Sequence, residues 1–327
     1  MRKWIAFIAG MIGASLIITA CDSAQGEGKD TLDKVVLDYA YYSPTSLALK
    51  EFGWAEEVFE EQGIEVEWVL SHGSNKALEF LNSSSVDFGS AAGAAALIAK
   101  SNGSAIESVY IYSKPEWTAL VATADSDIKS VEQLEGKKVA ATLGTDPYIF
   151  LLRSLQEAGL SSQDLEIVNL QHADGANALL TDQVDVWAGL DPHMAKVEVD
   201  SGANLFLRDH DKNTYGTLNV RSEFAEQHPE VIEKVIEVYE KAREWVIENP
   251  EEAAEILARE ADMDLEIAEK SLERNDFSDP IPGEKQIEAL NAAGEVLQAE
   301  SVIQENIDVK ELVEELIVEQ YSKNVIE

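Results

Sequence analysis

The chain has 327 residues, of which 62 are Asp or Glu and 25 are Lys or Arg, so its net charge at pH 7 is −37. This charge excludes nucleic acid as a natural partner, because phosphate contacts need Lys and Arg. A hydrophobic content of 45% indicates a globular protein, and the chain is long enough for two compact lobes with their own cores.

The first 20 residues have the pattern of a secretory signal peptide. Arg2 and Lys3 precede an uncharged run over residues 4–20, which is short for a membrane-spanning helix. The single cysteine, Cys21, ends the stretch ITAC, which resembles the bacterial lipobox, where the cysteine is lipidated and becomes the mature N-terminus. A chance cysteine at the end of a signal anchor is the alternative. We expect a signal peptide over 1–20, a flexible tether over 21–32, and an extracytoplasmic protein anchored to the outer face of the cell membrane through Cys21.

Strand and helix patterns alternate over residues 33–221. This alternation predicts an α/β fold with a mainly parallel sheet and helices on both of its faces. The predicted strands are Val35–Tyr39, Val66–Leu70, Val86–Gly89, Val109–Tyr112, Lys138–Thr142, Glu166–Leu170 and Val184–Ala188. The predicted helices include Leu47–Gln62, Lys76–Ser83, Ile149–Ala158 and Ala176–Thr181.

From Pro229 to the end of the chain, the pattern is helical. A stripe of apolar residues at helical spacing predicts a helix over Val231–Glu248, and Pro229 and Pro250 fit first-turn positions. Further helices are predicted at Glu251–Arg259, Leu265–Arg274, Lys285–Glu300 and Val309–Tyr321.

Two extended segments, Trp117–Thr123 and Thr217–Arg221, bracket a block of about 100 residues. A block that begins and ends at adjacent strands is typical of one lobe inserted into another. We therefore expect a first lobe over 33–117 plus 221–327, a second lobe over 118–220, and a hinge of two crossing segments.

The turns that follow the predicted strands are small and polar. They lie at residues 40–43, 72–75, 90–93, 143–146, 172–175 and 190–193. Ligands of parallel sheets bind beyond the carboxyl ends of strands, where helix N-termini favour anions and Gly permits close backbone approach. One such turn is an ordinary helix cap, whereas several turns that converge on one crevice would bind an anion without cationic side chains.

Aromatic and histidine side chains also occur near these turns. Tyr41 and Tyr42 end a strand and are expected in the crevice wall, whereas Trp117, Tyr148 and Trp187 fit either a wall or a core. Three of the turns contain a histidine: His72, His172 and His193. They could donate to an anion, be plain turn residues or, with Asp174 or Asp191, hold a metal. No HxH or HxxxH spacing supports a metal, so none is expected.

Motifs of common enzyme classes are missing from the sequence. It contains no GxSxG, HExxH, GxxxxGK[ST] or GxGxxG stretch. A lipidated Cys21 would not serve as a catalytic nucleophile. We expect no enzymatic activity and no cofactor.

Four stretches carry a family resemblance. They are VDFGSAAGAAALIAK (86–100), LEGKKVAATLGTDPYIFLLRSLQEAGL (134–160), VDVWAGLDPHMAKV (184–197) and VRSEFAEQHPEVIEKVIEVY (220–239). Together with the lipobox, they resemble the solute-binding lipoproteins of ABC importers for sulfonates, taurine and nitrate, most closely the aliphatic sulfonate and taurine branch. The resemblance implies a type II periplasmic-binding-protein fold of two Rossmann-like lobes joined by a two-strand hinge. It also implies a monomer without catalysis, whose partners are a membrane permease and, through it, a cytoplasmic ATPase.

The resemblance assigns binding residues to the turns. With the residues favoured above, the expected ligand-binding set is Tyr41, Tyr42, Ser43, Gly73, Ser74, Ser90, Ala91, Gly144, Thr145, Trp187, Asp191 and His193. Leu190 replaces an aromatic of the family, and Ala40 and Tyr41 replace Gln with Lys or Thr. These departures favour a ligand with an organic tail over bare nitrate or sulfate.

Three other functions fit the same features. One is a binding protein for a pyrimidine or another aromatic precursor, in which Tyr41, Tyr42 and Trp187 would stack on a ring. Another is an enzyme related to the thiamine-pyrimidine synthases, which share the fold but are cytosolic. A sensor lipoprotein without transport is the third.

Overall fold

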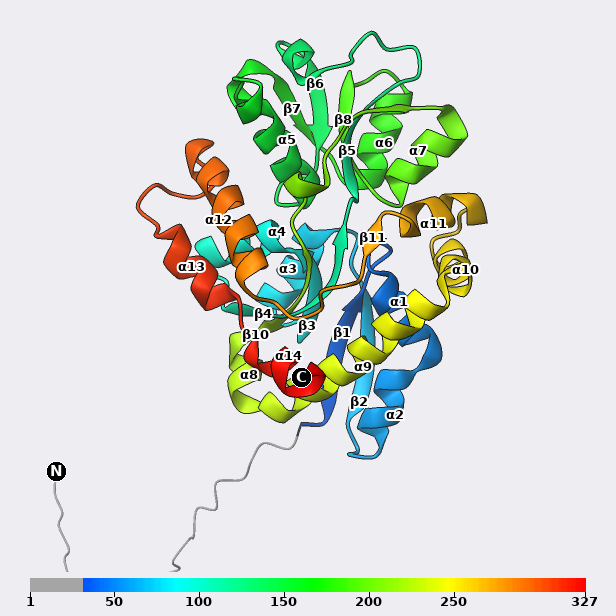
Figure 1. Cartoon of the computed structure of the whole chain (residues 1–327), viewed down its shortest axis with the longest axis vertical. Coiled ribbons are helices and arrows are strands. Elements are labelled where there is room, and N and C mark those ends of the chain that lie inside the picture. The colour runs from blue at the N-terminus through cyan, green and yellow to red at the C-terminus, as the bar shows by residue number, and fades with distance from the viewer. Residues whose placement is uncertain (1–31) are drawn as a thin grey trace, which may run out of the picture. The chain divides into compact units, whose positions relative to one another are not determined.

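The computed structural model describes residues 32–327 (Figure 1). Residues 33–327 form one compact unit that contains two β-sheets. The predicted signal peptide and Cys21 lie outside the described residues. We call the six-stranded sheet with its helices the first lobe, and the five-stranded sheet with its helices the second lobe.

The sheet of the first lobe has the strand order β11-β4-β10-β3-β1-β2. Strand β1 pairs in parallel with β2 and β3, whereas β10 runs antiparallel to β3 and β4, and β11 runs antiparallel to β4. The strands are β1 (Lys34–Tyr39), β2 (Glu65–Leu70), β3 (Phe88–Ala92), β4 (Ile106–Pro115), β10 (Gly216–Arg221) and β11 (Asn275–Asp276).

The sheet of the second lobe has the order β7-β6-β8-β5-β9, with β6 parallel to β7 and β8, and β5 antiparallel to β8 and β9. Both sheets are therefore mixed, and the prediction of a mainly parallel sheet was wrong. Strands that enter a lobe from the other lobe arrive in the opposite direction, which local patterns do not reveal. The strands are β5 (Thr118–Ala122), β6 (Lys138–Ala141), β7 (Glu166–Asn169), β8 (Val186–Leu190) and β9 (Asn204–Arg208).

Helices cover both sheets, and in the second lobe α5 lies on one side with α6 and α7 on the other (Figure 1). The helices of this lobe are α5 (Asp146–Glu157), α6 (His172–Leu180) and α7 (His193–Ser201), with short 3-10 turns η1 (Val131–Leu134), η2 (Ser162–Asp164) and η3 (His210–Lys212). Those of the first lobe are α1 (Pro44–Phe52), α2 (Trp54–Glu60), α3 (Ser74–Asn82), α4 (Gly93–Ser101), α8 (Ser222–Gln227), α9 (Pro229–Glu248), α10 (Pro250–Glu260), α11 (Leu265–Leu272), α12 (Glu284–Ala299), α13 (Val309–Leu316) and α14 (Gln320–Ile326).

The predicted helix over 47–62 is two helices. Gly53 ends α1 in the left-handed conformation, with φ at 65°, and its N–H caps the carbonyl of Lys50. The predicted helix over 309–321 is also divided. The chain becomes extended at Ile317, and the N–H of Val318 bonds to the carbonyl of Ser108 instead of continuing the helix.

Two segments connect the lobes, one directly after β4 and one directly before β10. Strand β10 is hydrogen-bonded within the six-stranded sheet, so the predicted lobe boundary after residue 220 falls inside this strand instead of before it. A short β-rich run does not show which sheet it joins. The segments 117–123 and 217–221, which we expected to be adjacent strands, therefore lie in different sheets, and the neighbour of β10 at the crossing is β4.

Asp146, the first residue of α5, ties the two connections together. Its carboxylate accepts hydrogen bonds from Trp117 Nε1 at 2.7 Å, from Thr214 N at 2.9 Å and from Thr214 Oγ1 at 2.6 Å. Thr214 also accepts a hydrogen bond from the N–H of Ala94 in the first lobe. Trp117 is buried where these hydrogen bonds join the two connections, so it belongs to the core and not to an open wall of a binding crevice.

The long helix α9 packs the predicted apolar stripe into the first lobe, with Val235, Ile236 and Tyr239 fully buried. Burial of such side chains stabilises a fold by about 1.5–3 kcal/mol each. None of the helices within residues 32–327 is long and apolar enough to cross a membrane.

Candidate functional site

The carboxyl ends of strands from both sheets meet at a small cavity, which we call the crevice. Its volume is about 20 Å³, which is room for about one water molecule. The first lobe contributes the turns after β1 and β2, and the second lobe contributes those after β7 and β8. The lining residues are Tyr41, Tyr42, Ser71, His72, His172, Leu190, Asp191, Pro192 and His193. No Lys or Arg is among them.

Two tyrosines form the wall that the first lobe presents. Tyr41 is half-buried and meets the ring of His72 edge-on, with the ring centroids 6.4 Å apart. Tyr42 is buried, donates its hydroxyl to the carbonyl of Ser90 at 2.9 Å and packs edge-on against Trp117. These contacts fix Tyr42, whereas Tyr41 is held less firmly and faces the crevice.

A buried carboxyl group lies beneath this wall. Asp38, in β1, is fully buried and accepts a hydrogen bond from the N–H of Ser90 at 2.7 Å. Burial raises the pKa of Asp38 to about 6, although the hydrogen bond opposes this shift.

Two histidines form the wall that the second lobe presents. His172 is 1% exposed, and its Nδ1 lies 3.2 Å from Thr142 Oγ1. Burial, followed by the neighbouring His193, lowers the pKa of His172 to about 3. Burial also lowers the pKa of His193, with further contributions from His72 and Lys196. His172 and His193 are therefore neutral at pH 7, and the wall that the second lobe presents has no positive charge of its own.

An ion-pair cluster closes one edge of the crevice. Arg274, which follows α11 in the first lobe, places Nη1 3.0 Å from each carboxylate oxygen of Asp191 in the second lobe, and its Nη2 contacts Glu198. Asp191 also accepts a hydrogen bond from the N–H of Ala195. Burial raises the pKa of Asp191 to about 6, while Arg274 acts in the opposite direction.

Sequence reasoning missed Arg274 and Glu198. Arg274 was assigned only to the end of a predicted helix, because nothing in its neighbourhood marks an ion-pair partner that lies 83 positions away. A lone basic residue in a strongly acidic chain is the one signal that could have drawn attention to it.

Two glycines lie where the lobes approach each other. A Cβ atom at Gly73 would lie 2.9 Å from His172 Nε2, and one at Gly144 would lie 3.9 Å from the Cβ of Asn75. Gly73 belongs to the first lobe and His172 to the second, so only a residue without a side chain allows this closeness. Both glycines were in the expected binding set.

Of the twelve expected binding residues, four line the crevice: Tyr41, Tyr42, Asp191 and His193. Three of the others are buried residues whose side-chain oxygens are engaged within their own lobe. Ser43 caps α1, Ser74 Oγ accepts from the N–H of Ala92, and Thr145 Oγ1 donates to the carbonyl of Thr142.

The third expected turn is partly a strand, because β3 extends to Ala92. Ser90 and Ala91 are therefore buried strand residues, and neither lines the crevice. Their carbonyls accept hydrogen bonds from Tyr42 and Thr217, respectively.

Trp187 does not form a crevice wall. It is fully buried in β8, within a core cluster that includes Ala140, Leu179 and Met194. Its indole lies against Gly175, where an added Cβ would be 2.7 Å from Nε1. The assignment of Trp187 to the ligand is therefore wrong for this structure, since a strand residue on a helix-covered face belongs to the core.

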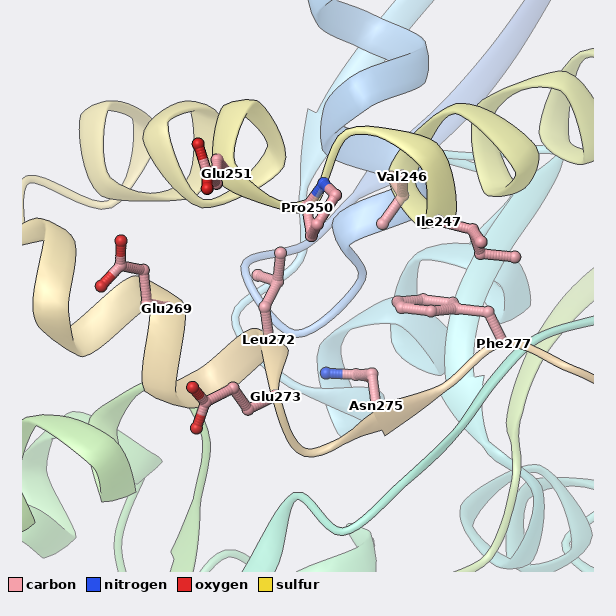
Figure 2. A pocket seen from close by; sticks show the side chains of 9 residues that line it. All are labelled: Val246, Ile247, Pro250, Glu251, Glu269, Leu272, Glu273, Asn275 and Phe277. Atoms are coloured by element: carbon pink, nitrogen blue, oxygen red, sulfur yellow. The ribbon is translucent and has the colours of Figure 1, made fainter.

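A larger cavity lies in the first lobe between α9, α10 and α11, with a volume of about 460 Å³ (Figure 2). Apolar side chains such as Ile247, Leu272 and Phe277 converge there, and Glu251, Glu269 and Glu273 line the same cavity. Three carboxylates disfavour an anion, and no turn after a parallel strand reaches this cavity.

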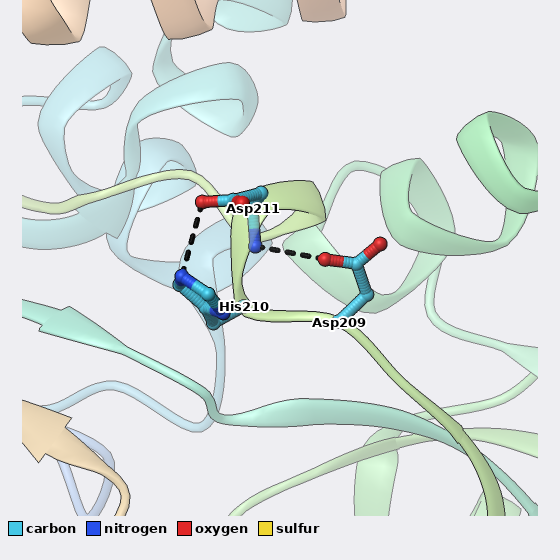
Figure 3. A group of neighbouring side chains, drawn as sticks. All are labelled: Asp209, His210 and Asp211. Atoms are coloured by element: carbon cyan, nitrogen blue, oxygen red, sulfur yellow. Dashed lines mark hydrogen bonds and ion pairs between the residues drawn. The ribbon is translucent and has the colours of Figure 1, made fainter.

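A metal site formed by the crevice histidines is not supported within the described residues. Among the described residues, the side chains that lie close enough together to hold a metal ion are those of Asp209, His210 and Asp211. They belong to the second connection between the lobes and not to the crevice (Figure 3). Both carboxylates already have cationic neighbours, since Lys212 contacts Asp209 and Lys114 lies 3.5 Å from Asp211.

Known proteins resemble this chain along most of its length. A Bacillus subtilis protein named as an aliphatic sulfonates-binding protein is 25% identical over 323 residues, which cover 97% of this chain and 96% of that protein. An Escherichia coli protein with the same name is 26% identical over 254 residues, 77% of each chain. These relatives confirm the resemblance inferred from the sequence.

Solved structures confirm the fold. The alkanesulfonate-binding protein SsuA from Xanthomonas axonopodis pv. citri, bound to MOPS, superposes with a TM-score of 0.80 at 22% identity, over 88% of this chain and 98% of that one. The two mixed sheets therefore form the expected periplasmic-binding-protein fold. The model of the family described as NMT1/THI5 like matches residues 52–253, which is more than half of the chain. The chain belongs to the NMT1/THI5-like family.

Proposed function

We propose that this chain is an extracytoplasmic solute-binding lipoprotein of an ABC importer that captures an aliphatic sulfonate or taurine by lobe closure. The observation that carries the proposal is the crevice, where turns of both lobes meet with no Lys or Arg among the lining residues. The relatives named for sulfonate binding support the same ligand class. They are named as binding proteins, which supports a role without catalysis.

Ligand capture requires the lobes to separate, because a cavity of about 20 Å³ is smaller than a sulfonate group with its tail. In the open form, the turns after β1, β2, β7 and β8 are exposed to water. A ligand that contacts both lobes binds the closed form better and therefore shifts the population toward closure. The permease then distinguishes the closed form from the open form.

The proposed anion contacts are backbone N–H groups of the turns, including those at Gly73, Ser74, Gly144 and Thr145, because the Thr145 hydroxyl already donates its proton to the carbonyl of Thr142. The distant surface charge of this acidic chain is screened within about 8–10 Å, whereas these dipoles act in contact with the ligand. Tyr41 is the aromatic side chain best placed to enclose the organic part. The remaining partners are a membrane lipid attached to Cys21, the permease and, through it, the ATPase, and the protein acts as a monomer.

A thermal-shift panel of alkanesulfonates, taurine, nitrate and pyrimidines tests the proposal. A sulfonate at 100 times its Kd stabilises the protein by about 2.7 kcal/mol. Stabilisation by a pyrimidine but by no sulfonate would overturn the proposal in favour of an aromatic-precursor binder. Turnover of any panel compound during incubation with the purified protein would favour an enzyme.

A further inference from the structure

Three of the five histidines of the chain line the crevice. They come from different turns: His72 follows β2, His172 begins α6 and His193 begins α7. The other two, His210 and His228, lie on η3 and between α8 and α9. Of the three crevice histidines, His172 is the most buried, at 1% exposed, and it is the one with a defined hydrogen-bond environment.

The hydrogen bonds around Thr142 determine which nitrogen of His172 carries the proton. Thr142 Oγ1 lies 2.6 Å from the carbonyl oxygen of Leu170, which can only accept, so the hydroxyl proton points there. The hydroxyl oxygen lies 3.2 Å from His172 Nδ1 and can therefore only accept a hydrogen bond from that nitrogen. Nδ1 carries the proton, and in the neutral imidazole Nε2 is a bare acceptor.

This acceptor faces the opposite lobe without a partner. Nε2 is buried and has no hydrogen bond, and a Cβ at Gly73 of the first lobe would lie 2.9 Å from it. A buried acceptor left unpaired is destabilising, so a ligand group that donates to Nε2 recovers stability that a methyl group does not.

The surroundings keep the imidazole neutral. Its pKa is lowered to about 3, first by burial and then by His193. His72 and Lys196, which act on His193, add no negative charge. The crevice carboxylate, Asp191, is already paired with Arg274, which also contacts Glu198. Nothing in the surroundings of His172 favours its protonated form before a ligand arrives.

We propose that His172 is a specificity-determining residue whose Nε2 accepts a hydrogen bond from an amino group of the ligand, so that the crevice selects amino-substituted sulfonates over plain alkanesulfonates of equal length. Thr142 is the positioning residue, because its hydroxyl fixes the proton on Nδ1. The inference rests on the proposed function and narrows its ligand class.

Taurine and 1-propanesulfonate form a matched pair for the test, because an ammonium group in one occupies the place of a methyl group in the other. We expect isothermal titration calorimetry of the full chain to give a Kd for taurine at least about tenfold lower than that for 1-propanesulfonate, equivalent to about 1.4 kcal/mol. The substitution His172→Phe keeps a planar ring without an acceptor and is expected to remove this preference. His210→Gln and His228→Gln are the controls and keep it.

Thr142→Val provides a second variant with little change of shape. Without the hydroxyl, the imidazole proton can move to Nε2, so the preference for taurine is expected to shrink through weaker taurine binding, while the affinity for 1-propanesulfonate stays unchanged. A merely structural role of Thr142 would weaken both ligands alike, and that result would overturn its assigned role.

The outcomes separate the two proposals. Equal affinities of the wild-type protein for both sulfonates would overturn the role of His172 and leave the proposed function in place. Tight binding of 1-propanesulfonate with uptake of about one proton, measured in buffers of different ionisation enthalpy, would also overturn it, because His172 would then act as a protonated donor. Binding of neither sulfonate would overturn the proposed function itself, and the inference with it.

Discussion

At Gly73 the backbone of the first lobe lies directly against His172 of the second lobe. The position needs no special backbone conformation, because its φ of 160° is extended. It needs the absence of a Cβ, which would lie 2.9 Å from both His172 Nε2 and Asn75 Oδ1. Glycine is therefore needed here because the missing Cβ lets the crevice close, and not because a turn requires its backbone freedom.

The substitution Gly73→Ala is expected to weaken sulfonate binding by about tenfold or more, because the imidazole and the lobe that carries it must move apart. Overpacking of this kind costs about 1–3 kcal/mol. Calorimetric titration of the variant measures the change.

Gly283→Ala is the matched control, since that glycine is also extended and an added Cβ would make only an ordinary contact at 3.7 Å with Glu319. Unchanged affinity of the Gly73 variant would show that the two lobes do not approach here in the bound state.

At the scale of elements, α7 and the segment after α11 form a contact between the lobes through charge. Arg274 is 6% exposed in its side chain and pairs with Asp191 and Glu198, while Lys270 lies 3.4 Å from Glu198 and is more exposed. Removing one partner of a buried pair is costly because it leaves the other charge uncompensated. Separation of the lobes would instead return Asp191 to water.

The substitution Arg274→Gln is therefore expected to favour the open form. It should lower sulfonate affinity by about tenfold or more and raise the radius of gyration of the ligand-free protein in small-angle X-ray scattering. Lys270→Gln, the more exposed member of the same cluster, should change affinity by no more than about twofold. If Arg274→Gln left both quantities unchanged, the ion pair would have no part in closure.

For the molecule as a whole, three buried carboxyl groups and two crevice histidines act in opposite directions on the pH dependence of stability. Burial raises the pKa values of Asp38, Asp146 and Asp191 to about 6, above the ordinary value of 3.8. The folded protein therefore binds these protons more readily than the unfolded chain. The contribution of these carboxyls to the free energy of unfolding decreases as pH rises from about 4 to about 6, because the unfolded state holds fewer of their protons in that window. His172 acts in the opposite direction, because its pKa is lowered from 6.5 to about 3 and the unfolded state binds its proton first.

We expect each of the three carboxyls to contribute on the order of 1 kcal/mol more to the free energy of unfolding near pH 5 than at pH 7, and urea unfolding of the wild-type protein and of a carboxyl variant at both pH values measures this share. About 0.5 M NaCl in both samples screens the repulsion among surface carboxylates. The variant Asp146→Asn loses the contribution of that carboxyl, so its free energy of unfolding at pH 5, relative to that at pH 7, is lower than in the wild-type protein. The same free-energy difference between pH 5 and pH 7 in the wild-type protein and in Asp146→Asn would contradict the raised pKa of Asp146.

Attachment to the membrane is also a property of the whole molecule. Cys21→Ser removes the thiol that the lipobox-like stretch presents for lipidation, so the protein is expected to leave the membrane fraction. Fractionation followed by a carbonate wash measures this, with wild-type protein as the control. Retention of the variant in the washed membranes would show that another part of the chain anchors it.

Local patterns in the sequence were enough to predict most of the elements. Alternating β-rich and helical runs predicted most strands and helices, because the side-chain periods of 2.0 and 3.6 are set by neighbours a few residues apart. The turns after the strands identified both walls of the crevice, including Tyr41, Asp191 and His193, since ligands of α/β folds bind at the carboxyl ends of strands.

Which of these residues meet depends on the folding of the whole chain. It joined β10 to the first sheet, made both sheets mixed, buried Trp187 in a core and brought Arg274 to Asp191, 83 positions away. It also placed Nε2 of His172 against Gly73. Such contacts depend on how the chain crosses twice between its lobes, and a local pattern of residues does not record the direction or the destination of a crossing.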